Sequence, residues 1–344
     1  MTRTAVVLFN LGGPDSPEAI QPFLNNLFND PAIIGLPWPL RPLLASVISN
    51  KRQKEARKIY ALIGGRSPLL EETRAQAGKL EARLDDDATR VFIAMRYWHP
   101  MAEDTALEVA AFAPDRVVLL PLYPQFSTTT TGSSLKAWHR AAAKAGLNAP
   151  TRAVCCYPFE EGLIAAHVRL LAKALDEAGE RPVRVLFSAH GLPEKIVKAG
   201  DPYQWQIEQT AAAVVARLAR RDLDWQVCYQ SRVGPLTWIG PSTDAEIKRA
   251  GKDGKGALVV PIAFVSEHSE TLVELDIEYA EMAKKEGCQP YLRVPALGVE
   301  EAFIDGLAAL VRAASATEAP EIGPDGGARL CPASWVKCPC REVA

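Results

Sequence analysis

Short apolar runs rich in valine, isoleucine and leucine alternate along the chain with longer segments of helical periodicity. Four runs fall near residues 5–9, 90–95, 116–121 and 151–156, and four more near 183–187, 225–229, 257–262 and 290–294. Such runs are typical of strands buried in a parallel sheet with helices on both faces. Because the later strands of the two sets recur at matching intervals, we predict one α/β unit used twice.

The same pattern divides the chain into two similar α/β domains, each with a four-stranded parallel sheet flanked by helices. We place the first domain at residues 1–175 and the second at residues 176–316, with the joint at the polar segment Asp176–Pro182. Residues 317–344 are predicted to be a linker and a cysteine-containing tail, because residues 319–328 are rich in glycine and proline without any period.

The first set of strands contains a long insertion, at about residues 30–75, that the second set lacks. Its segment Leu36–Leu44 is apolar, carries one arginine and is interrupted by three prolines, so it cannot be an ordinary core helix. Two interpretations remain open. The segment is either a loop folded against its own domain, or an exposed apolar lip that contacts a membrane or an apolar ligand.

Composition narrows the class of protein. The 344 residues include 39 basic and 41 acidic residues, a net charge of −2, and 48% hydrophobic residues, which is typical of a globular protein with two ordinary domains. The near-neutral balance argues against a dedicated nucleic-acid-binding protein. No apolar run reaches the roughly 18–20 residues that span a bilayer. The first strand leads into Gly12-Gly13-Pro14 without a signal-peptide cleavage site, so we expect a cytoplasmic protein with reduced cysteines.

Ligands of open parallel sheets bind beyond the carboxyl ends of the strands, so residues that follow strands are the candidates for chemistry. His190 follows the strand near residues 183–187 and stands beside Gly191 and Pro193, which restrict the backbone. An imidazole with an ordinary pKa of about 6.5 accepts protons at neutral pH. His190 is therefore a candidate general base.

An acidic segment follows the strand near residues 257–262. Residues 267–283 include six acidic residues and neither lysine nor arginine. Glu270, Glu274 and Glu278 are spaced so that they would stack along one face of an α-helix over about 12 Å. Like charges at that spacing repel each other. The segment is therefore either an acidic surface helix or a ladder of carboxylates that passes a divalent cation such as Fe²⁺ or takes protons.

Two further loops carry candidate binding residues. Trp238 stands in a loop shaped by glycine and proline, where its ring either lies against a flat ligand or packs beneath the loop. Arg66 follows Gly64-Gly65 on a predicted tight turn, and its guanidinium suits a carboxylate.

Three of the seven cysteines, Cys331, Cys338 and Cys340, fall in the last fourteen residues, where packing does not explain them. A fourth thiol is available from Cys155 or Cys156, at the end of the fourth strand. Four thiolates fit either structural zinc or an iron–sulfur cluster, and the spacing does not distinguish the two.

Taken together, these segments resemble the ferrochelatase family, lyases that insert Fe²⁺ into protoporphyrin IX in the last step of haem synthesis. The resemblance covers about residues 5–310. It rests on Leu11–Pro14, Gly64–Pro68, Arg96–Pro100, Tyr123–Gln125, Thr131–Ser134, Ser188–Gly191, Val233–Pro235 with Trp238, and Glu267–Tyr279. It implies two Rossmann-like, chelatase-type domains and a porphyrin-binding cleft.

The resemblance also implies roles for individual residues. It makes His190 and Glu270 the central catalytic pair, and places Glu274 and Glu278 on a path for the metal or for protons. The implied porphyrin contacts are Leu11, Arg66, Arg96, Tyr97, Tyr123 and Trp238. The two arginines among them are candidate partners for the propionates. Leu11 stands where other members have Met or Tyr, so it is not expected to ligate the metal.

Animal members of this family take one cluster ligand from the segment that reads Phe126–Thr128 here, which has no cysteine. Some bacterial members carry a C-x6-C-x-C tail and an internal cysteine, as this chain does. The resemblance to them favours a [2Fe–2S] cluster over zinc, with Cys331, Cys338, Cys340 and either Cys156 or Cys155 as ligands. It further implies weak, peripheral membrane association through the apolar lip, and it leaves a monomer and a homodimer open.

Three alternative functions remain. The first is a ferrochelatase that acts on coproporphyrin, since the same fold serves both substrates. The second is a chelatase for another tetrapyrrole, whose additional carboxylates would demand more arginine and lysine. The third is a non-catalytic carrier of haem or iron, because two-domain α/β folds also form binding proteins. A carrier would need no proton acceptor beside the acidic segment.

Overall fold

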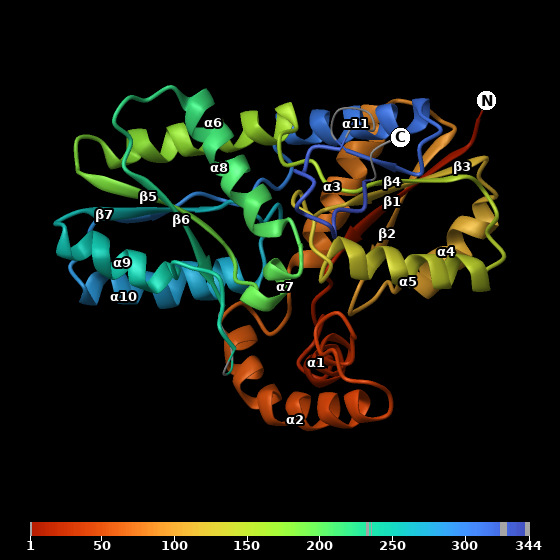
Figure 1. The fold of residues 1–344 in the computed structure, drawn as a ribbon, viewed down its shortest axis with the longest axis horizontal. Helices are drawn as coiled ribbons and strands as arrows, with labels where there is room; N and C mark the ends of the chain where they lie inside the picture. Colours follow the sequence, from red (N-terminus) through yellow and green to blue (C-terminus); the bar gives the residue numbers. More distant parts are fainter. Residues whose placement is uncertain (1, 232–233, 235, 324–328, 341–344) are drawn as a thin grey trace. The chain divides into compact units, whose positions relative to one another are not determined.

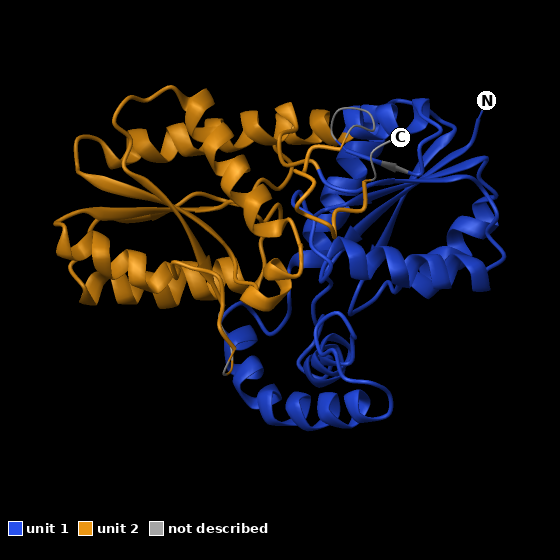
Figure 2. Ribbon diagram, viewed as in Figure 1, with its two compact units in different colours: residues 1–156, 308–328, 342–344 blue, residues 157–307, 329–341 orange. Residues whose placement is uncertain are grey.

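The computed structural model describes residues 2–231, 234, 236–323 and 329–340, and the chain forms two compact units (Figure 2). Unit 1 comprises residues 1–156, 308–328 and 342–344, and unit 2 comprises residues 157–307 and 329–341. The chain enters unit 2 after Cys156, earlier than the predicted joint at Asp176, because α6 (Glu161–Ala178) packs against α8 (Tyr203–Leu218) of unit 2. The chain returns to unit 1 within α11 (Glu301–Ala316).

Unit 1 is built on a parallel sheet with the strand order β2-β1-β3-β4-β9. The strands are β1 (Thr4–Asn10), β2 (Thr89–Met95), β3 (Arg116–Pro121), β4 (Thr151–Val154) and β9 (Glu321–Ile322). Every residue of β1 is buried, because α3 (Leu69–Leu84) covers one face of the sheet and α4 (Ala102–Phe112) and α5 (Thr131–Lys144) cover the other (Figure 1). The first four strands confirm the prediction.

The fifth strand of unit 1, β9, comes from the segment predicted to be a linker. The Cys155 backbone N–H donates to the Ile322 carbonyl at 2.9 Å, and the Ala153 N–H donates to the Pro320 carbonyl at 2.8 Å. The first half of the predicted linker is therefore ordered against the edge of the sheet. Residues 324–328 of the linker, and residues 341–344 of the tail, lie outside the described residues.

Unit 2 is built on a parallel sheet with the strand order β6-β5-β7-β8. Its strands are β5 (Val183–His190), β6 (Trp225–Gln230), β7 (Gly256–Pro261) and β8 (Tyr291–Arg293). Helices α6 and α8 cover one face, and α9 (Thr243–Lys252) and α10 (Tyr279–Lys285) cover the other (Figure 1). In each unit the first strand lies between the second and third, so the same α/β order is used twice, as the sequence predicted.

The predicted insertion, at about residues 30–75, contains α2 (Leu40–Ala61) and the start of α3, and α1 (Ile20–Phe28) precedes it. Helix α2 packs on α1, and both stand away from the sheet of unit 1 (Figure 1). The predicted lip, Leu36–Leu44, carries exposed apolar side chains, among them Trp38 at 76% and Leu43 at 68% exposure, and Val47 beyond it is 59% exposed. The segment is therefore an exposed lip rather than a loop folded against its own domain, and its contact with a membrane or an apolar ligand stays a prediction. No helix in the described part of the chain has the length and apolar character needed to cross a bilayer.

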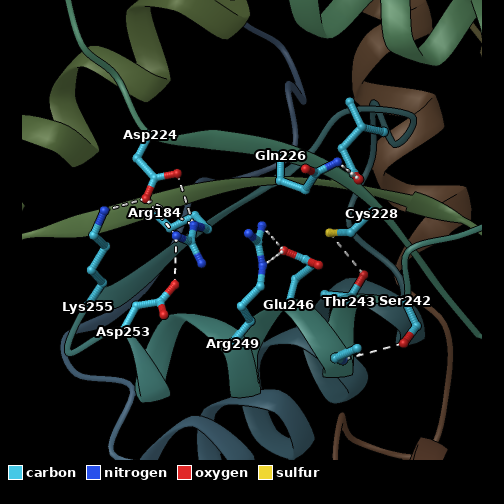
Figure 3. A network of polar contacts seen from close by, with 12 residues as sticks. Arg184, Asp224, Gln226, Cys228, Ser242, Thr243, Glu246, Arg249, Asp253 and Lys255 are labelled. Atoms are coloured by element: carbon cyan, nitrogen blue, oxygen red, sulfur yellow. Dashed lines mark hydrogen bonds and ion pairs between the residues drawn. The ribbon is translucent and has the colours of Figure 1, made fainter.

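An ion network lies at the amino ends of the strands in unit 2 (Figure 3). Arg184, near the start of β5, lies 3.0 Å from carboxylate oxygens of both Asp224 and Asp253, and Nζ of Lys255 lies 2.6 Å from Asp224. The Arg184 side chain is only 6% exposed. A buried guanidinium is tolerated when carboxylates compensate its charge. We call these four residues the amino-end network.

Candidate active site

His190 is the last residue of β5, so its side chain stands at the carboxyl end of a central strand of unit 2. Its Nδ1 lies 2.8 Å from Oε2 of Glu270. The side chains are 43% and 26% exposed, respectively, so the pair is partly open to ligands. Because Nδ1 faces Glu270, the other ring nitrogen, Nε2, is the one left to face a substrate. The fold thus brings together two residues that the sequence singled out 80 positions apart.

Glu270 begins a π-helix, η1 (Glu270–Glu278), where an α-helix was predicted. π-Helical turns are rare and often lie at functional sites. Glu270 and Glu274 both approach the hydroxyl of Ser231, whereas the side chain of Glu278 is exposed and has no hydrogen bond or ion pair with the described residues. The predicted α-helix is therefore wrong for residues 270–278, which form η1, whereas Glu270 and Glu274 do lie close to each other at Ser231. A path for the metal or for protons that includes Glu278 stays a prediction.

Glu274 is held by four donors. The Ser231 backbone N–H donates to Oε1 at 3.0 Å, and the Ser231 hydroxyl donates to Oε2 at 2.5 Å. The amide of Gln230 donates to Oε2 at 3.1 Å, and the hydroxyl of Tyr279 donates to Oε1 at 3.0 Å. Ser231 reaches this position in the left-handed conformation, with φ +60°. Its hydroxyl also lies 3.3 Å from Oε2 of Glu270, so it bridges the two carboxylates.

The charges of this group depend on one another. Burial disfavours the carboxylate of Glu270, but the charge and hydrogen bond of His190 outweigh burial and lower the pKa of Glu270. Burial likewise disfavours the imidazolium of His190, but Glu270 outweighs it and raises the pKa of His190. Burial and the nearby charge of Glu270 raise the pKa of Glu274. The site therefore favours an imidazolium–carboxylate pair, with a second carboxyl group that takes up protons more readily than usual.

Sequence reasoning missed two residues beside the pair. The hydroxyl of Tyr203, the first residue of α8, donates to the backbone carbonyl of His190 at 3.1 Å. His268 is 9% exposed, packs edge-on against Phe264 with ring centroids 4.5 Å apart, and has a pKa that burial lowers. The position of His268, two residues before Glu270 in the acidic segment, was the signal that could have identified it.

Unit 1 contains a second polar group, centred on Asp30. This carboxylate is 3% exposed and accepts hydrogen bonds from Arg96 Nη2 at 2.7 Å, from the Tyr97 hydroxyl at 2.8 Å and from the Ser133 hydroxyl. Burial raises the pKa of Asp30, but the hydrogen bond from Ser133 and the charge of Arg96 outweigh burial and lower it. Asp30 was not predicted. Tyr97 is 1% exposed, and its side chain contacts Asp30 and the Arg96 guanidinium rather than solvent.

The remaining predicted porphyrin contacts differ in exposure. Arg66 is 63% exposed and lies 3.5 Å from Glu71. Leu11 is half-buried directly after β1, and its N–H donates to the side chain of Asn10. The Tyr123 hydroxyl is buried, and burial raises its pKa. In unit 2, Trp238 is half-buried and its indole N–H is buried without a partner among the described residues.

The predicted ligand cysteines are all buried. Cys331, Cys338 and Cys340 belong to unit 2 and are 4%, 8% and 2% exposed. Cys155 and Cys156 follow β4 in unit 1, with their Sγ atoms 3.6 Å apart. Within the described residues, no group of three or more histidine, cysteine or acidic side chains is gathered closely enough to hold a metal ion.

Two parallel α/β units of the same strand order form the fold that this chain shares with solved structures of chelatases. The solved structure of SirB from Bacillus subtilis with Fe³⁺ matches 92% of this chain and 96% of its own, with a TM-score of 0.56 and 11% identity. The cobalt complex of the sirohydrochlorin chelatase SirB matches with a TM-score of 0.53, 10% identity, and coverage of 92% and 97%. At such identities the likeness shows the fold alone.

Sequence comparison is more specific. The family model described as Ferrochelatase matches residues 3–315. The ferrochelatase of Caulobacter vibrioides strain NA1000 is 59% identical over 347 residues, and that of Phenylobacterium zucineum is 58% identical over 346. The matches cover 99% of this chain and 99% and 98% of those proteins. This chain belongs to the ferrochelatase family. It is a lyase whose substrates are a porphyrin and Fe²⁺ and whose product is haem.

Proposed function

We propose that the chain inserts Fe²⁺ into protoporphyrin IX, with His190 as the proton acceptor and Glu270 as its stabilising partner. The observation that carries the proposal is the 2.8 Å contact between His190 Nδ1 and Glu270 Oε2 at the carboxyl end of β5. In the neutral imidazole, Nδ1–H donates to Glu270, which leaves the Nε2 lone pair to take a proton from a pyrrole N–H. The Glu270 carboxylate then stabilises the imidazolium that forms.

Metal insertion releases two pyrrole protons, so the site must pass protons onward. Ser231 bridges Glu270 and Glu274, and the pKa of Glu274 is raised by burial and by Glu270. A proton received by the His190–Glu270 pair can therefore move through the Ser231 hydroxyl to Glu274. Glu278, exposed at the end of η1, would then connect this path to solvent or receive Fe²⁺.

The predicted porphyrin contacts have different proposed roles in substrate binding. We propose that Arg66 and Arg96 hold the propionates, because guanidinium groups pair with carboxylates through two parallel hydrogen bonds. Leu11, Tyr123 and Trp238 would contact the macrocycle. Tyr97 would act indirectly, because its hydroxyl donates to Asp30, which also accepts a hydrogen bond from Arg96.

Cysteine thiolates are the usual ligands of iron–sulfur clusters, so the predicted cysteines suit such a cluster by residue type. Cys331, Cys338 and Cys340 are buried although Val336, between the first two, is 69% exposed. We propose that these thiols and either Cys156 or Cys155 hold a [2Fe–2S] cluster. When bound, such a cluster supplies a one-electron redox couple. A red-brown protein with two irons and two sulfides per chain is expected, whereas a colourless protein that contains zinc would overturn the assignment.

The lip suits peripheral contact with a membrane on the cytoplasmic side. Trp38, Leu43 and Val47 expose apolar surface on one short segment, and Lys51, Arg52 and Lys54 follow on the same helix. Apolar anchoring beside basic residues is typical of interfacial helices. The chain is expected to float with lipid vesicles, and the double variant Trp38→Ser, Leu43→Ser is expected to remain behind.

The direct test is anaerobic incubation of the chain with Fe²⁺ and protoporphyrin IX, monitored by the haem absorption spectrum. Catalytic turnover of protoporphyrin is expected. Faster turnover of coproporphyrin than of protoporphyrin IX would identify coproporphyrin as the substrate instead. Stoichiometric binding of haem or iron without turnover would show a carrier and overturn the proposal.

A further inference from the structure

The cysteine tail, residues 329–340, packs on the turn between α7 (Glu194–Lys198) and α8. The backbone N–H of Lys337 donates to the carbonyl of Gly200 at 3.0 Å. Gly200 has φ +98°, and a Cβ added there would lie 2.5 Å from Cγ2 of Val336. The glycine is therefore required both by its backbone conformation and by the close approach of the tail. One turn into α8, Gln206 donates to Sγ of Cys331 at 3.1 Å.

Arg329 shapes the tail that makes these contacts. Its Nε donates to the carbonyl of Cys331 at 2.9 Å, and its Nη2 donates to the carbonyls of Pro332 at 3.1 Å and Trp335 at 3.0 Å. A guanidinium presents its donors in a rigid plane, so one arginine can fix several carbonyls of a loop at once. Residues 331–335, which precede the contact with Gly200, are thus held by a single side chain.

The turn on which the tail packs is connected to the candidate catalytic histidine through the side chain of Tyr203. Tyr203 is 7% exposed; its backbone N–H donates to Oδ1 of Asp201 at 3.0 Å, and its hydroxyl donates to the carbonyl of His190 at 3.1 Å. Asp201 is fully buried. The Tyr203 ring therefore connects the turn on which the tail packs to the backbone that carries the His190 imidazole.

We propose that Tyr203 is a positioning residue for His190 and that the packed tail holds Tyr203 in place. The tail then supports the alignment of His190 Nδ1 with Glu270, and its packing sets the rate of proton transfer rather than the affinity for porphyrin. Because the inference rests on the proposed role of His190, its test requires a wild-type chain that forms haem.

The test is a double-mutant cycle in the full-length protein. Tyr203→Phe removes only the hydroxyl, and Arg329→Ala loosens the tail. Each is expected to lower kcat by about 3- to 10-fold, the range for loss of one aligned hydrogen bond, while KM for porphyrin changes less than twofold. The double variant is expected to be no slower than the slower single variant, because both act through one contact.

Lys337→Ala is the matched control, because the Lys337 side chain is exposed and its contact with Gly200 is made by the backbone. It removes one positive charge from the same tail and is expected to leave kcat unchanged. If Arg329→Ala does not fold, Arg329→Lys keeps the charge and removes the planar set of donors. Iron and sulfide content are measured for every variant, so that loss of a cluster is recognised.

Hydrogen exchange gives a readout that does not depend on turnover. Arg329→Ala is expected to speed exchange in the peptide that covers residues 190–203, and Lys337→Ala is not. Effects of Tyr203→Phe and Arg329→Ala that multiply, or unchanged exchange at residues 190–203, would overturn the inference while leaving the proposed function intact. Absence of haem formation by the wild-type chain would instead count against the proposed function.

Discussion

The two ends of the four-stranded sheet in unit 2 differ in the kind of partner that compensates a buried carboxylate. At the amino ends, Arg184 and Lys255 pair with Asp224, and Arg184 also pairs with Asp253 (Figure 3). At the carboxyl ends, the described partners of Glu270 and Glu274 are a histidine, a side-chain amide, a backbone N–H and hydroxyl groups.

The difference separates stability from chemistry. Burial raises the pKa of Asp224, but the hydrogen bonds and charges of Arg184 and Lys255 outweigh burial and lower it, so this carboxylate stays charged across the neutral range. Histidine and hydroxyl partners do not hold a carboxylate in its charged form as arginine and lysine do. The pKa values of His190 and Glu274 are both raised. The amino end can hold the sheet together, whereas the carboxyl end can exchange protons.

The largest expected effect lies at the carboxyl end. His190→Ala should lower kcat for haem formation by about 10²- to 10⁴-fold, the contribution typical of a positioned general base, with little change in Tm. Steady-state kinetics under anaerobic conditions measure it. His139→Ala, at an exposed histidine of α5, serves as the control and should retain normal rates. Near-normal turnover by a folded His190→Ala protein would contradict the claim that the carboxyl end of the sheet supplies the general base.

The opposite pattern is expected at the amino end. Asp224→Asn leaves Arg184 and Lys255 poorly compensated and should lower the free energy of unfolding by about 1–3 kcal/mol, while kcat stays within twofold. Urea denaturation measures the loss.

The contribution of Asp224 also depends on pH in a defined direction. Because the folded-state pKa is lowered, the contribution is complete above the unfolded value of about 3.9 and is lost as pH falls through the folded value. The stability difference between wild type and Asp224→Asn should therefore shrink in acid. A difference that persists in acid, or a large fall in kcat, would show that the two ends are not separable.

The smallest expected effect concerns the bridge between the carboxylates. Hydrogen bonds from Ser231 lower the pKa values of both Glu270 and Glu274, so Ser231→Ala should raise both. We expect kcat to fall by about 2- to 5-fold, consistent with loss of one hydrogen bond. Ser231→Thr, which keeps the hydroxyl, should recover most of the rate. Equal rates for the alanine variant and wild type would remove Ser231 from the proposed path.

Much of the fold could be predicted because buried parallel strands have a strong sequence pattern. All eight apolar runs became strands, and β5 between β6 and β7 repeats the order of β1 between β2 and β3. The two-residue strand β9 has no such pattern, since its pairing depends on an edge that only the folded sheet supplies. The unit boundary differed because α6 is assigned by packing against α8, which no local signal reveals.

The candidate site was predictable where a residue follows a strand or repeats along a helix. His190 and Glu270 met that condition, and the structure places them in contact. The π-helix was not predictable, because spacings of four residues suit an α-helix as well. Ser231, Tyr203 and Asp30 are single polar residues in turns or at a helix start, and only their tertiary hydrogen bonds distinguish them from ordinary loop residues.

The central claim is that Glu270 raises the basicity of His190, and an NMR titration of the labelled His190 imidazole tests it most directly. In the wild-type chain, the transition is expected above the ordinary histidine value of about 6.5, since the carboxylate favours the imidazolium. The neutral, proton-accepting form therefore appears as pH rises through the raised pKa. In Glu270→Gln the transition should move to lower pH, because burial then acts on the imidazolium without the opposing charge. An unchanged transition in the variant would contradict the account.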